Sequence, residues 1–162
     1  MGFEIERKFL VKNETYRQNS EATLYRQAYL CHLKERTVRV RVAKDKGFLT
    51  IKGATIGARR PEFEYDIPFS DAQIMIDSLC ETDIVEKNRY LAAHDGMIWE
   101  VDEFLGLNAG LVVAEIELTD ENQVFSVPDW VGVEITDDPK YYNSNLAKNP
   151  YCDWSKTERR RG

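Results

Sequence analysis

Charged side chains recur two residues apart along short stretches of this sequence, with apolar residues between them. The first stretch carries Glu4, Glu6 and Lys8. Carboxylate oxygens are the ligands that hard divalent cations prefer, and lysine and arginine side chains bind phosphate oxygens. Residues two apart on a β-strand lie about 6.5–7 Å apart on one face, where like charges repel unless a counter-ion lies among them. One such stretch is common on a solvated sheet edge, so it indicates a functional site only if the pattern is repeated elsewhere in the chain.

The same alternation returns in six further segments. Because successive side chains of a strand point to opposite faces, each segment places its charged residues on one face and its apolar residues on the other. Seven strands of this kind indicate one shared charged site rather than seven independent solvated faces. The polar pairs are Arg39 with Arg41, Thr50 with Lys52, Glu62 with Glu64, Lys87 with Arg89, Glu100 with Asp102, and Glu115 with Glu117.

The elements that must position these residues are mostly strands, because the alternation has a period of two. A good N-cap at Ser70 predicts a helix over residues 71–79, and Thr119 or Asp120 predicts another over residues 121–125. We expect the strands near residues 3–11, 24–33, 36–44, 47–53, 61–68, 83–93, 97–104 and 111–119.

Eight antiparallel strands with one charged face cannot pack as an ordinary sandwich, since that would bury the charges. Closing the sheet on itself removes its edges and gives the charges a common interior. We therefore predict a mainly β (α+β) fold, a closed eight-stranded antiparallel β-barrel tunnel with a charged lumen and a few covering helices. The helices cover part of the apolar outer face, and a second copy of the chain could cover more, which predicts a homodimer.

Length and composition favour one tunnel domain over residues 1–150, followed by a tail over residues 151–162. The net charge of −6 argues against a general nucleic-acid binder, because no net basic field exists to displace phosphate counter-ions. The three cysteines are widely spaced and suggest a reducing compartment. No apolar run is long enough for a membrane helix, and Arg7 and Glu86 on the outer face argue against a membrane barrel. We expect a cytoplasmic protein without nucleic-acid or membrane partners.

The segment from Glu4 to Lys8 resembles the Glu-x-Glu-x-Lys signature of the CYTH superfamily, the triphosphate tunnel metalloenzymes. The resemblance spans roughly residues 3–148, since the other charged pairs follow in the family's order and residues 141–146 look like its closing segment. It implies a tunnel that binds a triphosphate through basic residues and uses carboxylate-bound Mg²⁺ or Mn²⁺. Small bacterial-type members similar to this chain are mostly inorganic triphosphatases, while relatives include thiamine triphosphatases and class IV adenylyl cyclases.

The resemblance implies roles for these charged residues, apart from Glu100, to which no role is assigned. For catalysis we expect Glu4, Glu6, Lys8 and Glu64, with Glu4 or Glu64 orienting the attacking water. Substrate binding is expected from Lys8, Arg39, Arg41, Lys52, Lys87 and Arg89. The metal ligands are expected among Glu4, Glu6, Glu62, Glu64, Asp102, Glu115 and Glu117, with Glu6, Glu115 and Glu117 foremost.

The expected activity is metal-dependent hydrolysis of inorganic tripolyphosphate to diphosphate and phosphate, by in-line attack of water. Two alternatives stay open at this point. A class IV adenylyl cyclase or thiamine triphosphatase would use the same phosphate-binding residues together with a pocket for an organic group. A non-catalytic module that binds polyphosphate or nucleotides would need the cations but would have little use for so many acids.

Overall fold

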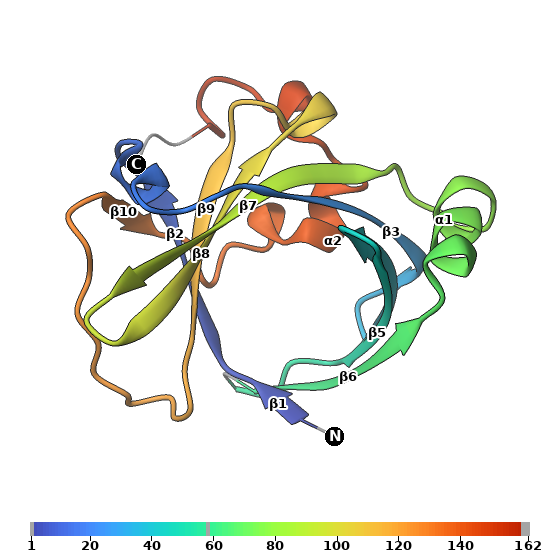
Figure 1. Cartoon of the computed structure of the whole chain (residues 1–162), viewed down its shortest axis with the longest axis horizontal. Coiled ribbons are helices and arrows are strands. Elements are labelled where there is room, and N and C mark those ends of the chain that lie inside the picture. The colour runs from blue at the N-terminus through green and yellow to red at the C-terminus, as the bar shows by residue number, and fades with distance from the viewer. Residues whose placement is uncertain (1, 58, 160–162) are drawn as a thin grey trace.

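A computed structural model describes residues 2–57 and 59–159 and shows a mainly β protein (Figure 1). Its ten strands form one antiparallel sheet in the order β1-β6-β5-β4-β3-β7-β8-β9-β2-β10. The strands are β1 (Gly2–Glu4), β2 (Glu6–Val11), β3 (Thr23–Leu33), β4 (Arg36–Ala43), β5 (Lys46–Gly53), β6 (Arg60–Ile67), β7 (Val85–His94), β8 (Met97–Phe104), β9 (Val112–Glu117) and β10 (Val131–Glu134). The helical elements are η1 (Thr15–Arg17), α1 (Phe69–Ser78), η2 (Gly106–Asn108), η3 (Pro139–Tyr141), α2 (Asn143–Leu146) and η4 (Tyr151–Asp153).

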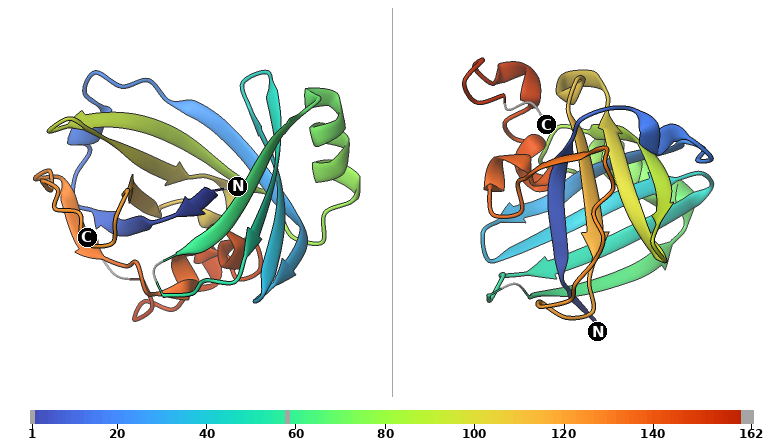
Figure 2. Two further views of the ribbon diagram at one scale, coloured as in Figure 1. Left: turned by 90° about the horizontal axis from the view of Figure 1, so that it is seen from below. Right: turned by 90° about the vertical axis from the view of Figure 1, so that its left-hand side faces the viewer.

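The prediction of a closed eight-stranded barrel is wrong. Across the described residues the hydrogen bonds form an open sheet that begins at β1 and ends at β10. The predicted first strand is divided at Ile5, so that β1 pairs with β6 while β2 pairs with β9. The other side of β2 is occupied by β10, with Val131 opposite Val11, and is therefore not available to β6. The sheet curls around a central space, and the chain through Ile5 joins its two sides (Figures 1 and 2).

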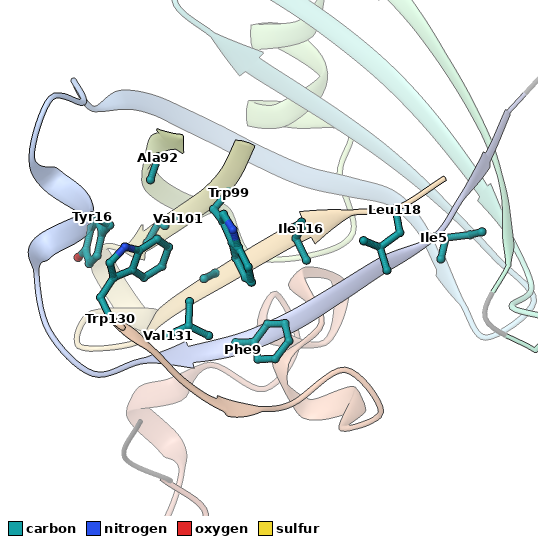
Figure 3. Packing of buried hydrophobic residues seen from close by; sticks show 11 residues of the cluster. Ile5, Phe9, Tyr16, Ala92, Trp99, Val101, Ile116, Leu118, Trp130 and Val131 are labelled. Atoms are coloured by element: carbon teal, nitrogen blue, oxygen red, sulfur yellow. The ribbon is translucent and has the colours of Figure 1, made fainter. Parts of the chain in front are cut away.

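The outward face of β2, β8 and β9 carries a large aromatic core (Figure 3). Trp99 is fully buried and packs edge-to-face against Phe9 and Trp130, with ring centroids 5.5 and 5.8 Å apart. Tyr16 of η1 lies over Trp130 at 5.7 Å. On each strand the residues of this core alternate with the charged residues. Because the apolar side chains pack on the outward face, the charged side chains point inward.

A second core lies where α1 covers the outward face of β3, β4 and β5. Ala72 and Ile76 of the helix pack against Ala28 and Val40. The close approach requires Gly47, because a Cβ there would lie 2.7 Å from the Cβ of Ala72. The helix predicted over residues 71–79 is confirmed as Phe69–Ser78, but the predicted N-cap is wrong, since the cap is Pro68 and Ser70 lies in the first turn. The helix predicted over residues 121–125 is wrong, since that segment contains only turns and irregular backbone.

The C-terminal elements pack against inward-facing residues at one end of the curled sheet. Tyr141, Leu146 and Trp154 form a core with inward-facing apolar residues such as Val113 and Phe104. The tail predicted from residue 151 thus includes η4 and the buried Trp154, while residues 160–162 lie outside the described residues. One end of the curl is therefore filled by apolar side chains, and the charged residues lie beyond it.

Part of the outward face stays uncovered. Phe3 is 57% exposed and Tyr65 is 55% exposed, on the neighbouring strands β1 and β6. The homodimer that would cover such a surface stays a prediction. None of the helices in the described part of the chain has the length and apolar character needed to cross a membrane.

Candidate active site

The inward face of the curled sheet surrounds a cavity of about 690 Å³. The segment over residues 136–144 completes its wall. Every charged residue predicted for the site lines this cavity except Asp102, which lies behind the wall. The predicted residues that line it are Glu4, Glu6, Lys8, Arg39, Arg41, Lys52, Glu62, Glu64, Lys87, Arg89, Glu115 and Glu117.

Strand register places carboxylates directly opposite one another on this inward face. Glu6 of β2 pairs with Glu117 of β9, and Glu115 of β9 pairs with Glu100 of β8. Directly opposed side chains have Cβ atoms about 4.5–5.5 Å apart, and like charges there are destabilising. Burial and the neighbouring Glu115 both raise the pKa of Glu100, although Arg89 opposes them. These acids are therefore suited to hold a cation between them.

Lys8 neutralises part of this acid group. Its Nζ lies 2.9 Å from Glu115 Oε1 and 3.1 Å from Glu6 Oε1. Burial alone would lower the pKa of Lys8, but the two carboxylates raise it above its usual value. The same ion pair holds the pKa of Glu115 below its usual value in spite of burial. Lys8 thus stays protonated and Glu115 stays ionised. The backbone N–H of Lys8 also donates to Thr136 Oγ1 at 3.0 Å, which ties β2 to the segment that completes the wall.

Two arginines on β4 share a single carboxylate. Arg39 and Arg41 approach Glu64 Oε2 at only 3.4 and 3.5 Å, while Thr50 donates to the same oxygen at 2.7 Å. Within the described residues the buried Nε atoms of both arginines lack a hydrogen-bond partner. Burial, together with the charge of Arg39, lowers the pKa of Arg41 to about 10. Both arginines line the cavity, and one carboxylate does not compensate two guanidinium groups, so part of their positive charge stays available to an anion there.

A buried network positions the cations of β7. Asp102 is fully buried; its Oδ2 accepts from Lys87 Nζ at 2.6 Å and its Oδ1 from Arg89 Nε at 2.7 Å. Arg89 also contacts Glu100 at 2.6 Å, and Asn143 Oδ1 accepts from Lys87 Nζ at 2.8 Å. Lys87 therefore uses two of its three ammonium hydrogens inside the wall and retains one for the cavity. Burial lowers its pKa to about 8.

Sequence reasoning missed several residues of this site. Arg60 lines the cavity two residues before Glu62, so the same period of two indicates it; Glu100 is named in the charged pattern with Asp102 but is given no role there. Asn143 reaches the cavity from the C-terminal segment. No local pattern marks this asparagine, since its contact with Lys87 spans 56 positions of the chain.

The inward face of this curled antiparallel sheet surrounds a cavity lined by cations and carboxylates. Such a cavity is typical of proteins that bind polyanions. The family comparison makes this class specific: the CYTH domain matches residues 2–147, and the chain belongs to this family. The resemblance drawn from the sequence is thereby confirmed.

Two curated relatives are named inorganic triphosphatases. The protein from Acetivibrio thermocellus is 54% identical, over 93% of this chain and 97% of its own. The protein from Nitrosomonas europaea is 36% identical, over 89% of this chain and 96% of its own. A crystal structure of an inorganic triphosphatase superimposes with a TM-score of 0.66 at 33% identity, over 91% of this chain and 95% of that chain. A putative adenylate cyclase from Bacillus halodurans has a TM-score of 0.60 at 19% identity, over 75% of this chain and 84% of that chain, which shows the fold alone.

Proposed function

We propose that this protein is an inorganic triphosphatase that hydrolyses tripolyphosphate to diphosphate and phosphate with a divalent metal ion. The names of its relatives support the reaction. The observation that carries the proposal is the cavity itself, in which Arg39 and Arg41 share the single carboxylate of Glu64 at 3.4 and 3.5 Å. A triphosphate carries about four negative charges near neutral pH and supplies the negative charge that one carboxylate does not provide for two arginines.

The basic residues bind and orient the substrate. Arginine can hold a phosphate through two parallel hydrogen bonds, whereas lysine acts as a point charge. Because phosphoryl transfer depends mainly on positioning and charge neutralisation, holding the phosphates in one line accounts for much of the catalysis. The residues in this role are Lys8, Arg39, Arg41, Lys52, Lys87 and Arg89.

The carboxylates on β2 and β9 fit a divalent metal by their chemistry. Glu6 and Glu117 oppose each other across the two strands, and Glu115 lies on the same face. In the described residues no three acidic, histidine or cysteine side chains are already gathered as a metal site, since Glu6 and Glu115 contact Lys8 instead. We assign Mg²⁺ or Mn²⁺ to Glu6, Glu115 and Glu117, with Glu4 and Glu62 as neighbouring acids. When bound, the metal supplies positive charge to the phosphate oxygens and lowers the pKa of water.

Glu64 is the acid best suited to orient the attacking water. Its pKa is lowered, because hydrogen bonding from Thr50 and the charges of Arg41 and Arg39 outweigh its burial, so it stays an acceptor. All three of its contacts are made by Oε2. Oε1 forms no hydrogen bond with the described residues and is thus available to a water molecule. Glu4, in contrast, is held by Lys52 at 2.6 Å.

The experiment that tests the function compares tripolyphosphate, ATP and thiamine triphosphate with Mg²⁺ and with Mn²⁺. We expect kcat/KM for tripolyphosphate to exceed the other two by about tenfold or more, since 1.4 kcal/mol of binding suffices for that. A ring needs aromatic stacking, but Trp99, Trp130 and Trp154 are buried in the cores, and of the aromatic residues only Tyr29 and Tyr142 line the cavity in the described part of the chain. Equal turnover of ATP, or cyclic AMP as a product, would favour a cyclase; binding without release of phosphate would favour a non-catalytic module.

Lys87 makes the activity depend on pH. We expect kcat/KM to fall as the pH rises through about 8, because Lys87 has a pKa of about 8 and loses its charge above it. The profile of kcat/KM reports the ionisation of the free enzyme. In Lys87→Met this alkaline decline should disappear, at a lower overall rate. If the decline stayed the same in the variant, it would come from the substrate or another group.

A further inference from the structure

Arg60 is a cation of the cavity that the charged pairs of the sequence do not include. It is the first residue of β6, faces inward, and lies opposite Glu4 of β1 in the register. Tyr142 borders the same region: burial raises its pKa, while the charges of Lys8 and Arg60 act in the opposite direction. Arg60 therefore lies at the side of the cavity where the C-terminal segment completes the wall.

Arg60 differs from its neighbours in having no carboxylate partner. Every other lysine or arginine that lines the cavity has a carboxylate within 4.0 Å. In the part of the chain that the structure describes, Arg60 forms no such ion pair. Glu4, which lies opposite in the register, is bound by Lys52 at 2.6 Å, so the half-buried Arg60 has no carboxylate within 4.0 Å among the described residues. An anion is the partner that such a group would accept.

The guanidinium of Arg60 is nevertheless held in place. Its Nε donates to the carbonyl oxygen of Gly53 at 2.7 Å, and its Nη2 donates to Thr37 Oγ1 at 3.3 Å. These two bonds use two of the five N–H groups and leave three. Because the group is anchored through neutral acceptors, its charge stays available and its orientation is already determined before an anion arrives.

We propose that Arg60 binds a phosphate group of the substrate, next to the part of the cavity served by Lys8. This assignment rests on the proposed function for the identity of the anion. It adds Arg60 to the substrate-binding residues as a contact made equally with the bound substrate and the transition state, because its guanidinium is anchored by Gly53 and Thr37 and not by the opposed acids of β2, β8 and β9 that we assign to the metal. Such a contact affects KM and leaves kcat unchanged.

The test uses Arg60→Gln, with Arg59→Gln as a matched control. Arg59 precedes it directly but is more than half exposed and has Glu121 as its partner at 3.6 Å. We expect KM for tripolyphosphate to rise about tenfold or more in Arg60→Gln, the scale of one charge-assisted contact, with kcat unchanged. Arg60→Lys, which keeps the charge but loses the planar fork, should show a smaller rise. Arg59→Gln should keep both parameters.

A binding measurement separates this inference from the proposed function. Titration calorimetry with tripolyphosphate in EDTA measures affinity without turnover, and the Kd should weaken by the same factor in Arg60→Gln. A weaker Kd supports the inference even if the wild-type protein releases no phosphate, which would overturn only the function. An unchanged KM and Kd would overturn the inference while the function stands. So would an equal loss in Arg59→Gln, or a fall in Tm and kcat at constant KM, which indicates a structural role.

Discussion

Glu117→Gln is expected to lower kcat by about 10²–10³-fold, the scale of losing one preorganised electrostatic group at a reaction centre. The substitution keeps the shape of the side chain and removes one of the two carboxylates that oppose each other at Glu6 and Glu117. Tm should not fall, because Glu117 is exposed to the cavity and forms no ion pair with the described residues, and its removal relieves the repulsion from Glu6. Phosphate release at saturating Mg²⁺ and at saturating Mn²⁺ measures the effect.

The matched control is Glu86→Gln, which removes a carboxylate from the outward face of β7, where Glu86 contacts Arg26 at 3.4 Å. This variant should retain wild-type kcat. EDTA should abolish turnover in the wild-type protein, and added Mg²⁺ or Mn²⁺ should restore it. Full turnover in EDTA, or wild-type kcat in Glu117→Gln, would contradict the assignment of a metal to these acids.

Asp102→Asn is expected to lower the free energy of unfolding by about 3–5 kcal/mol, because removing one member of a buried ion pair leaves the other charges uncompensated. Asp102 is fully buried between Lys87 and Arg89. The variant should also lose activity, since both cations lose the group that orients them. Urea unfolding followed by circular dichroism measures the first effect, and phosphate release measures the second.

A double variant tests whether charge is the cause. Arg89 keeps Glu100 as a partner at 2.6 Å, whereas Lys87 keeps no carboxylate within 4.0 Å in the described residues, so adding Lys87→Met to Asp102→Asn should restore part of the lost stability. Asp66→Asn, at an exposed position on the inward face of β6, is the control and should leave stability unchanged. A loss below about 1 kcal/mol in Asp102→Asn, the size of an ordinary net hydrogen bond, would contradict a buried charged network.

The pH dependence of stability follows from the same residue. The pKa of Asp102 in the folded protein is lowered from its ordinary value of 3.8, because the charges of Lys87 and Arg89 outweigh its burial. A lowered pKa contributes stability that is present above the unfolded value and is lost as the pH falls through the folded value. We expect the wild-type protein to lose this contribution below about pH 4, and Asp102→Asn to show a shallower decline.

Alternation in the sequence determined the face to which each charged residue belongs. A period of two is a local property of strand geometry, so Glu115 and Glu117, or Arg39 and Arg41, must share a face whatever the strand pairs with. The apolar residues between them, such as Trp99, then select the outward side by burial. The same alternation predicted the mainly β class, and the order of the charged pairs along the chain indicated the family.

Only the tertiary structure decided which of these residues reach the cavity. Glu100 and Asp102 share one face of β8, yet Glu100 lines the cavity while Asp102 lies behind it with both oxygens bound to Lys87 and Arg89. The division of the first strand at Ile5 depends on β6 and β9, and the edge of β2 depends on β10, all of which lie far along the chain. Pairing between distant strands depends on long-range packing. The alternation of residues within one strand carries no information about which strand will be its neighbour.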